Sequence, residues 1–281
     1  MQSHPTPQTE IPPCKPFLKW AGGKQRLLKS IRPLLAPGKR LIEPFLGAGS
    51  VFLGTDYDRY LLGDANPDLI AVWVALQVRP QEFIRRAEQF FTPENWAPDA
   101  YYRIRKEFNE EEDRFERAVR FIYLNRFGFN GVYRVNSAGV MNTPYGHPKA
   151  MPLYPQAALE GAARKLDRAK LHSGGFRFAL EEAGDGDVVY CDPPYSDVGV
   201  ESFTGYTQGG FGIDEHRVLC ALASEAAERG AVVAVSNHDN DHTRQLYSGW
   251  KVYELEVSRT VGRDGRGRSK ADELLAVLTR S

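Results

Sequence analysis

Cysteine is scarce in this sequence, and long apolar runs are absent. The three cysteines, Cys14, Cys191 and Cys220, lie far apart and form no C-x-x-C pair, which argues against a disulfide framework and a cysteine zinc site. The longest aliphatic run, Ala231 to Val235, is far shorter than the roughly 18 residues that a membrane span needs. The N-terminal stretch MQSHPTPQTEIPPC lacks the cationic and apolar segments of a secretion signal. We therefore expect a cytoplasmic protein that does not enter a membrane.

A net charge is also missing. The 36 lysines and arginines balance the 36 aspartates and glutamates, which excludes a global basic field as the basis of nucleic-acid binding. Any such binding must come from local basic patches. With 42% hydrophobic residues among 281, the chain can bury one sizeable core, or one core and a smaller appended domain.

Strand and helix patterns alternate after an N-terminal tail, residues 1–15, that we expect to be disordered. Residues 25–35 predict a helix, and the stretches RLIEPF and YLLGD, residues 40–45 and 60–64, predict strands. Asn66-Pro67 then predicts a helix start, because Asn caps helices and Pro suits the first helical position. This alternation is typical of a parallel, doubly wound sheet.

The strand signal disappears from about residue 66 to 127. Three or four helical patterns follow one another there, with breaks at Pro80, Pro93 and Pro98. The next stretch, residues 128–149, is rich in Gly and Asn and predicts a hairpin and loop.

The α/β pattern then returns. The predicted elements are the strands RFAL (177–180), VVYC (188–191) and AVVAVS (231–236), a helix over 214–229, and two last strands, KVYELEV (251–257) and ELLAVLT (273–279). We expect a Rossmann-like α/β sheet with an antiparallel C-terminal hairpin over residues 16–65 and 152–281. An inserted helical domain would occupy residues 66–151.

The turn after the first predicted strand is glycine-rich. EPFLGAGSVF places Gly47 and Gly49 there, where the lack of side chains lets a ligand approach the backbone, although such a turn is often only a tight connection. Phe52 stands where a dinucleotide fingerprint has its third glycine, which disfavours a pyrophosphate. Asp64 ends the second strand, where it can accept hydrogen bonds from ribose or cap the next helix. Together the two strand ends favour an adenosine-bearing ligand such as S-adenosylmethionine.

A second glycine-rich stretch, PFLKWAGGKQRLL, precedes the first strand. Trp20 would offer a flat apolar wall, Gly22 and Gly23 free backbone amides, and Lys24 a cation suited to a carboxylate. S-adenosylmethionine has such a carboxylate. The alternatives are a core or lid tryptophan and a lysine on a solvated helix face.

The stretch VVYCDPPY ends a short apolar run in an acid, two prolines and a tyrosine. The prolines forbid further ladder pairing and an immediate helix, so the chain must leave the sheet at Asp192. Asp192 and Tyr195 are therefore expected at the mouth of a strand, where open α/β sheets bind ligands. A bare D-P-P would by default be only a proline turn.

Five motifs, FLKWAGGK, EPFLGAGSVF, YLNRFGFNGVYRVN, VVYCDPPY and SNHD, occur in this order. Together they closely resemble the Dam-type DNA adenine methyltransferases, the D12 class, and the resemblance runs from about Pro16 to the C-terminus. It implies a Rossmann-like methyltransferase fold with an inserted DNA-recognition domain. It also implies methyl transfer from S-adenosylmethionine to adenine N6 in duplex DNA, within GATC, after the target base has flipped out of the helix.

The resemblance implies roles for single residues. Asp192 and the Pro193 carbonyl would accept hydrogen bonds from the target amine, and Tyr195 would stack on the base. The cofactor residues would be Trp20, Lys24, Phe45, Gly47, Gly49, Asp64 and Asp192. The DNA-binding residues would be Phe129, which would enter the base stack, and Asn130, Val132, Arg134 and Lys149.

Two segments, GFNGVYR and the last loop, leave alternatives open. By itself GFNGVYR also fits a stabilising hairpin with a solvated arginine, and His147-Pro148 stand where the family usually has a basic and an aromatic residue. The last loop can bind phosphate or be merely solvated; it has a single acid, Asp264, among the basic residues Arg259, Arg263, Arg266, Arg268 and Lys270.

Two further patterns imitate other chemistry. HDNDH, with His238 and His242, has metal-like spacing, but it follows a strand and Asp241 is expected to cap the next helix, so we expect no metal. The pair Pro13-Cys14 matches the nucleophile motif of cytosine C5 methyltransferases, but it lies in the tail.

Two other functions compete with the leading hypothesis. One is a methyltransferase of the same fold that acts on RNA or a protein amide, since a D-P-P-Y pocket requires only a planar amine. The other is a DNA-binding protein with a vestigial pocket, which the intact Asp192 and cofactor residues argue against. We expect duplex DNA as the partner, a monomer in solution, and a cytoplasmic, nucleoid-associated protein.

Overall fold

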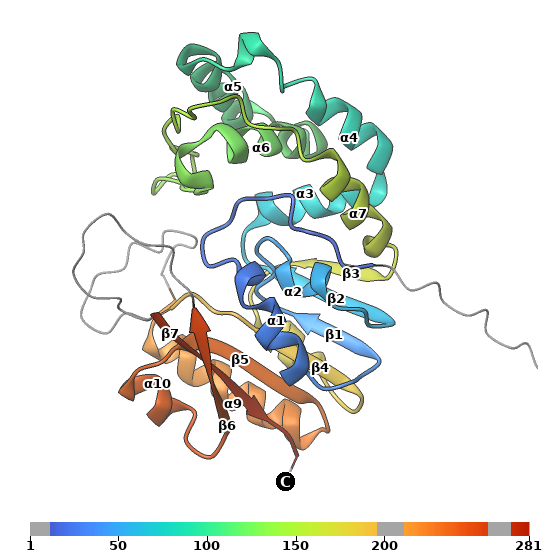
Figure 1. The fold of residues 1–281 in the computed structure, drawn as a ribbon, viewed down its shortest axis with the longest axis vertical. Coiled ribbons are helices and arrows are strands. Elements are labelled where there is room, and N and C mark those ends of the chain that lie inside the picture. The colour runs from blue at the N-terminus through green and yellow to red at the C-terminus, as the bar shows by residue number, and fades with distance from the viewer. Residues whose placement is uncertain (1–11, 196–210, 258–270, 281) are drawn as a thin grey trace, which may run out of the picture.

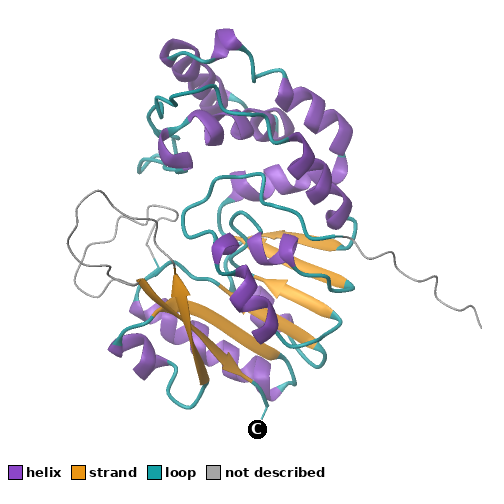
Figure 2. Ribbon diagram, in the orientation of Figure 1, coloured by secondary structure: helices purple, strands orange, loops and turns teal. Residues whose placement is uncertain are grey.

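A seven-stranded sheet forms the centre of the computed structural model, which describes residues 12–195, 211–257 and 271–280. Figure 2 shows the strands of this sheet in orange, and their order is β3-β2-β1-β4-β5-β7-β6. The strands are β1 (Arg40–Glu43), β2 (Arg59–Asp64), β3 (Ala169–Ser173), β4 (Asp187–Cys191), β5 (Val232–His238), β6 (Lys251–Val257) and β7 (Ala271–Leu278). The first five run parallel, whereas β7 is antiparallel to β5 and β6. The expected Rossmann-like sheet with an antiparallel C-terminal hairpin is confirmed.

The sheet has its switch point between β1 and β4, which pair at its centre. From β1 the chain continues outward to β2 and β3, and from β4 it continues outward to β5 on the other side. Connections that diverge in this way leave a crevice beyond the carboxyl ends of the two central strands. Glu43 and Cys191 are the last residues of these strands, so the segments that follow them border the crevice.

Apolar cores lie on both faces of the sheet, because successive strand residues point to opposite faces. Leu41 and Val188 belong to one core, and their neighbours Ile42 and Val189 belong to the other. The first face is covered by α1 (Leu28–Ile31), α2 (Ser50–Gly54) and α3 (Pro67–Val78), and the second by α8 (Arg177–Glu182), α9 (Ile213–Glu228) and α10 (Asp241–Leu246).

A helical block follows β2. It consists of α4 (Pro80–Glu88), α5 (Pro98–Glu110) and α6 (Arg114–Phe127), with α7 (Gln156–Leu166) leading back to β3. Figure 1 shows α4, α5 and α6 together beyond the β3 edge of the sheet, with α3 and α7 between them and the sheet. Prolines begin α3, α4 and α5, and the side chain of Asn66 caps α3 by accepting the backbone N–H groups of Asp68 and Leu69. The start of α3 at Pro67 agrees with the sequence prediction, and the predicted breaks at Pro80 and Pro98 are the starts of α4 and α5.

Residues 128–149, which we call the hairpin, lie between α6 and the segment leading to α7. Its two arms pair through isolated bridges, Gly128 with Tyr145 and Val135 with Met141, and not through continuous strands. The expected hairpin is therefore present, but most of its length is irregular.

Three expectations about single elements were wrong. RFAL was predicted as a strand but lies in α8, where Ala179 and Leu180 are buried against the second face. The strand of this region is β3, an edge strand whose half-exposed side chains leave little apolar signal. The helix expected over 25–35 is only α1 flanked by 3-10 turns, since Pro33 lacks the N–H group that would continue it. The cap of α10 is Asn240 and not the expected Asp241, which lies in the first turn of the helix. No helix was predicted where α7 lies.

The described chain begins with residues of the expected tail. Pro12 is the first of them, and the Cys14 backbone N–H donates to the Leu53 carbonyl at 3.1 Å. The basic loop, residues 258–270, lies outside the described residues. Among the residues that are described, none of the helices is long and apolar enough to cross a membrane.

Lys165 in α7 is a fully buried cation at the C-terminal end of α2. Its Nζ donates to the carbonyl oxygens of Phe52 at 2.9 Å and Leu53 at 3.4 Å, and also to that of Thr55. These carbonyls belong to the C-terminal end of α2, where unpaired acceptors and the helix dipole favour a cation. Burial nevertheless lowers the pKa of Lys165 to about 8.

We expect the stability contribution of Lys165 to depend on pH. Its folded pKa lies below the value of roughly 10.4 for an unfolded lysine, so between pH 8 and that value the unfolded chain binds more protons and stability rises with pH. The free energy of unfolding of the wild type, measured relative to Lys165→Met, should rise by about 1–2 kcal/mol from pH 7.5 to 9.5. Urea unfolding at several pH values measures this, with the exposed position Lys170→Met as the control for charge loss. A difference in unfolding free energy that does not change with pH would contradict this prediction.

Candidate active site at the switch point of the sheet

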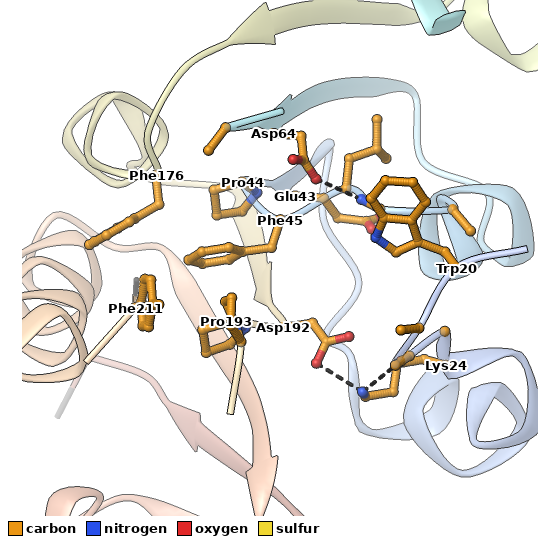
Figure 3. Close-up of a pocket in the computed structure, with 18 of the residues that line it drawn as sticks. Trp20, Lys24, Glu43, Pro44, Phe45, Asp64, Phe176, Asp192, Pro193 and Phe211 are labelled. Carbon is orange, nitrogen blue, oxygen red and sulfur yellow. Dashed lines mark hydrogen bonds and ion pairs between the residues drawn. The ribbon is translucent and has the colours of Figure 1, made fainter. Parts of the chain in front are cut away.

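A cavity of about 530 Å³ opens at the carboxyl ends of the central strands (Figure 3). Its size falls within the range of small-molecule sites. Its lining includes eight residues that the sequence predicted as catalytic or cofactor residues: Trp20, Lys24, Phe45, Gly47, Asp64, Asp192, Pro193 and Tyr195. The structure thus brings together residues from three distant motifs.

The glycine-rich turn is built around two indole rings. Gly47 and Gly49 both have positive φ, at 49° and 67°, a conformation that side chains disfavour. A Cβ on Gly47 would lie 3.0 Å from the ring of Trp20, and one on Gly49 would lie 2.9 Å from the ring of Trp73. Gly49 does not line the cavity. We expected the approach of a ligand to require this glycine, but the close packing of Trp73 requires it instead.

Asp64 holds this turn to the start of α3. One of its carboxylate oxygens accepts the Gly47 backbone N–H at 3.0 Å, and the other accepts that of Asn66 at 2.9 Å. Burial raises the pKa of Asp64, and the two backbone hydrogen bonds oppose that rise. Asp64 lines the cavity, as the predicted ribose contact requires, but the cap of α3 is Asn66, whose backbone N–H Asp64 accepts.

An ion pair lies at the mouth of β4. Lys24 Nζ lies 2.9 Å from Asp192 Oδ1 and donates to the Gly22 carbonyl at 2.9 Å, and its side chain is only 4% exposed (Figure 3). Burial raises the pKa of Asp192, and the adjacent Lys24 ammonium partly offsets this by favouring the carboxylate. Glu273 of β7 completes the group, since its Oε2 lies 3.7 Å from Lys24 Nζ and accepts the Tyr195 hydroxyl at 3.2 Å.

Glu43, the last residue of β1, is a second acid buried beside Asp192. Its side chain is 2% exposed, and its Oε1 has no hydrogen-bond partner among the described residues. Burial raises the pKa of Glu43 well above its usual range, and the charge of Asp192 adds to the rise. An unpaired buried acceptor at the wall of a cavity suits a ligand that brings a donor.

Charge in the cavity is unbalanced. Its lining includes the acids Glu43, Asp64, Asp192 and Glu215, and the only lysine or arginine among the described lining residues is Lys24. A pyrophosphate would meet repulsion here, whereas a ligand with positive groups would be attracted. The donor and acceptor set fits a small zwitterionic cofactor that carries extra positive charge.

Three phenylalanines form an apolar end of the same cavity (Figure 3). The ring of Phe45 stacks on that of Phe176 at 5.5 Å between centroids, and Phe211 meets both rings at 5.5 and 5.6 Å. Such a cluster offers flat apolar surface to a planar ring.

Sequence reasoning missed four residues of this site: Glu43, Phe176, Phe211 and Glu273. Glu43 could have been found, because it is an acid between an apolar strand and Pro44, the same signature as Asp192 before Pro193. The other three had no local signal. Glu273 reaches Tyr195 only because β7 is paired with β5, where it lies opposite His238.

The five predicted DNA-binding residues all lie on the hairpin, and none of them lines the cavity. Phe129 is 52% exposed, and Asn130 has a positive φ of 51° that few residues other than glycine adopt. Arg134 is exposed, and its Nε donates to the Asn142 side-chain oxygen at 2.7 Å while Nη2 donates to the Asn142 carbonyl at 3.1 Å. Val132 is half-buried and Lys149 is exposed.

Comparison with known proteins relates the chain to one family. The model of the D12 class N6 adenine-specific DNA methyltransferases matches residues 20–261. The chain is similar to a DNA adenine methylase of Vibrio cholerae serotype O1 (strain ATCC 39315 / El Tor Inaba N16961), with 45% identity over 94% of this chain and 95% of that protein. It is also similar to the DNA adenine methylase of Escherichia coli (strain K12), with 42% identity over 93% of this chain and 94% of that protein.

Solved structures give a weaker likeness. An rRNA methyltransferase from Streptomyces viridochromogenes is 14% identical with a TM-score of 0.36, over 94% of this chain and 90% of that chain. The relationship of this chain to known proteins therefore rests on the sequence matches.

We expect Gly49→Ala to cost more stability than Gly139→Ala. Both glycines have positive φ, 67° and 75°, so both alanines carry the left-handed penalty of about 1 kcal/mol. A Cβ on Gly139 has open space, whereas one on Gly49 meets Trp73, which adds about 1–3 kcal/mol of overpacking. Urea unfolding of the two variants measures the difference. Equal losses of stability in the two variants would show that the ring of Trp73 moves away from the new Cβ without an energetic cost.

Proposed function

The chain belongs to the D12 class of N6 adenine-specific DNA methyltransferases, and we propose that it methylates adenine N6 within GATC in duplex DNA after flipping the target base. The observation that carries this proposal is the position of Asp192. This residue follows β4 at the switch point of the sheet and lines an acid-rich cavity. We further propose residues 66–151 as the target-recognition region, residues 16–65 and 152–281 as the catalytic region, and the cytoplasmic nucleoid as the place of action.

S-Adenosylmethionine is the cofactor that the cavity supports, and when bound it supplies an electrophilic methyl group on a positively charged sulfur. Asp64 would accept hydrogen bonds from the ribose hydroxyls, as acids at this strand end do. Glu43 would accept one from the ammonium group, for which its unpaired Oε1 is suited. Lys24 would meet the carboxylate, and Trp20 and Phe45 would provide flat apolar surfaces.

Asp192 and Pro193 would activate the target amine. The nitrogen of adenine N6 is a poor nucleophile because its lone pair is delocalised into the ring. Two acceptors, a carboxylate oxygen of Asp192 and the Pro193 carbonyl, would bind both N–H groups and allow the nitrogen to pyramidalise. The ammonium of Lys24, 2.9 Å away, helps to keep Asp192 ionised in a site whose burial opposes ionisation.

Tyr195 would hold the extruded base by stacking. Its hydroxyl is fixed by Glu273 at 3.2 Å, and its ring packs on His238 at 4.1 Å between centroids. A ring held on two sides loses little further freedom when the base arrives, which favours the near-attack geometry that methyl transfer requires.

The hairpin would read the sequence and open the stack. The exposed ring of Phe129 is suited to enter the duplex beside the flipped base, and flipping costs a few kcal/mol that such contacts offset. Arg134 would pair with a guanine edge, with its guanidinium oriented by Asn142. Asn130, Val132 and Lys149 would add base or backbone contacts.

The test of this function uses duplex DNA that contains every four-base word. The purified protein is incubated with S-adenosylmethionine, and sequencing identifies each modified base. We expect N6-methyladenine in GATC alone, and its loss by more than about 100-fold in Asp192→Ala, in line with the loss of a group that acts at the reacting atom. Thermal unfolding and DNA binding of the variant check that its fold is intact.

The outcomes of this test separate the alternatives. Methylation of another word would replace the target assignment, and methylation of RNA or protein alone would replace the substrate. Substantial turnover by a folded Asp192→Ala would remove Asp192 from its role while leaving the reaction in place.

Arg134 allows base reading to be distinguished from phosphate binding. We expect Arg134→Ala to lower the preference for GATC over a site with one altered base pair by about 10–100-fold, because a bidentate pair between arginine and guanine contributes about 1–3 kcal/mol of discrimination. The measurement is kcat/KM on the two duplexes for the wild type and the variant. If alanine lowers activity equally on both duplexes, Arg134 is a phosphate contact.

A further inference from the structure

We propose that Asn125, at the end of α6, is a positioning residue that couples the cofactor cavity to the hairpin, so that each site binds more tightly when the other is filled. This inference rests on the proposed function, in which Trp20 borders the cofactor and the hairpin reads DNA. Asn125 contacts neither ligand in that arrangement, and it acts through the backbone segments that it joins.

The amide of Asn125 joins the two segments directly. Its side chain is 4% exposed, and its Oδ1 accepts the backbone N–H of Lys19 at 2.8 Å. Its Nδ2 donates to the Lys19 carbonyl at 2.7 Å and to the Gly131 carbonyl of the hairpin at 3.1 Å. Both hydrogens and the oxygen of one buried amide are therefore used to hold the residue before Trp20 against the hairpin.

The backbones at this junction lie too close to move independently. A Cβ on Gly131 would lie only 2.4 Å from the Cβ of Lys19, so the hairpin packs directly on the segment before Trp20. Gly131 has a φ of 67° and follows Asn130, whose φ is also positive. The contact thus falls at a turn with two successive positive φ angles, next to the proposed DNA residues Phe129 and Asn130.

A stack of aromatic rings makes a second connection between the same segments. The Trp20 ring lies 6.4 Å from Tyr133 of the hairpin and 6.4 Å from Phe121 of α6, with interplanar angles of 22° and 25°. Tyr133 in turn donates its hydroxyl to Asp68, which also binds Arg117 through both carboxylate oxygens. The hairpin is thus held against the cavity wall at Gly131 and again at Tyr133.

These contacts imply an energetic consequence. A cofactor that packs against Trp20 restricts the motion of that segment, and through Asn125 it restricts the turn at Gly131 as well. DNA that then binds the hairpin loses less conformational entropy, which is positive coupling without a large change of shape. Coupling between two binding sites is reciprocal, so DNA must raise cofactor affinity by the same factor.

The chain contains a matched control in Asn109 of α5. Its side-chain oxygen accepts the Met141 backbone N–H at 2.9 Å, and its Nδ2 donates to the Met141 carbonyl at 3.0 Å. It therefore anchors the other arm of the hairpin with the same chemistry, and Met141 does not belong to the cavity wall. An aspartate at either position keeps the side-chain oxygen that accepts the backbone N–H. It replaces the donating Nδ2 by a second oxygen, which then lies against a backbone carbonyl.

The experiment compares the full chain with Asn125→Asp and Asn109→Asp. We measure the Kd for a short GATC duplex with and without saturating S-adenosylhomocysteine, and the Kd for S-adenosylhomocysteine with and without the duplex. We expect the wild type to show a coupling factor of about 5–100, equal in both directions. Asn125→Asp should reduce this factor at least fivefold, whereas Asn109→Asp should retain it even if it lowers stability.

A coupling factor of one in the wild type would overturn the inference, and so would a coupling factor that Asn125→Asp retains. Equal losses of coupling in Asn125→Asp and Asn109→Asp would also overturn it, because they would indicate general weakening of the hairpin. Failure of the wild type to bind S-adenosylhomocysteine or DNA would instead count against the proposed function.

If Asn125→Asp does not fold, hydrogen exchange of the wild type provides the test. S-Adenosylhomocysteine alone should slow exchange of the Gly131 and Val132 amides, whose acceptors are Gly128 and Phe129, more than that of Asn136 and Gly139 near the tip. Equal or absent protection would overturn the proposal.

Discussion

The arrangement of the site depends on one buried lysine. Lys24 is the only lysine or arginine among the described residues that line the cavity, and it faces the carboxylates of Asp192 and Glu273. Without it, three buried or half-buried acids, with Glu43 as the third, would repel one another at the open end of the sheet. A lysine ammonium with three donors is suited to this place, since it binds the Gly22 carbonyl and the two acids from one point.

The same constraint accounts for the chemistry that the cavity favours. The excess of acid groups disfavours a pyrophosphate and favours a cofactor with positive charge, which is the electrostatic character of S-adenosylmethionine. Burial raises the pKa values of Glu43, Asp64 and Asp192, so the charged forms depend on partners that the ligand and Lys24 provide. The site is therefore poised for a ligand that completes its hydrogen bonds and balances its charge.

The rest of the molecule serves to bring this cavity and the hairpin together. The turn at Gly47 and Gly49 leaves room for two indole rings, and one of these, Trp20, is shared between the cavity and the aromatic stack that contains Tyr133. The ammonium of Lys165 binds the C-terminal end of α2 from a helix that follows the hairpin. The cavity wall at Trp20 and the hairpin are linked through the buried contacts of Tyr133 and Asn125.

By itself, the sequence determined what depends on neighbours along the chain. Proline and asparagine placed the starts of α3, α4 and α5, the two prolines after Asp192 ended β4, and the order of the motifs indicated the family. The tertiary structure alone brought Glu273 to Tyr195 and Asn125 to Lys19. These pairs are far apart in sequence, and they meet because β7 is inserted beside β5 and because α6 lies against the segment before Trp20. Edge strand β3 was missed for a related reason: half-exposed side chains carry little apolar pattern, and its pairing with β2 supplies the hydrogen bonds that make it a strand.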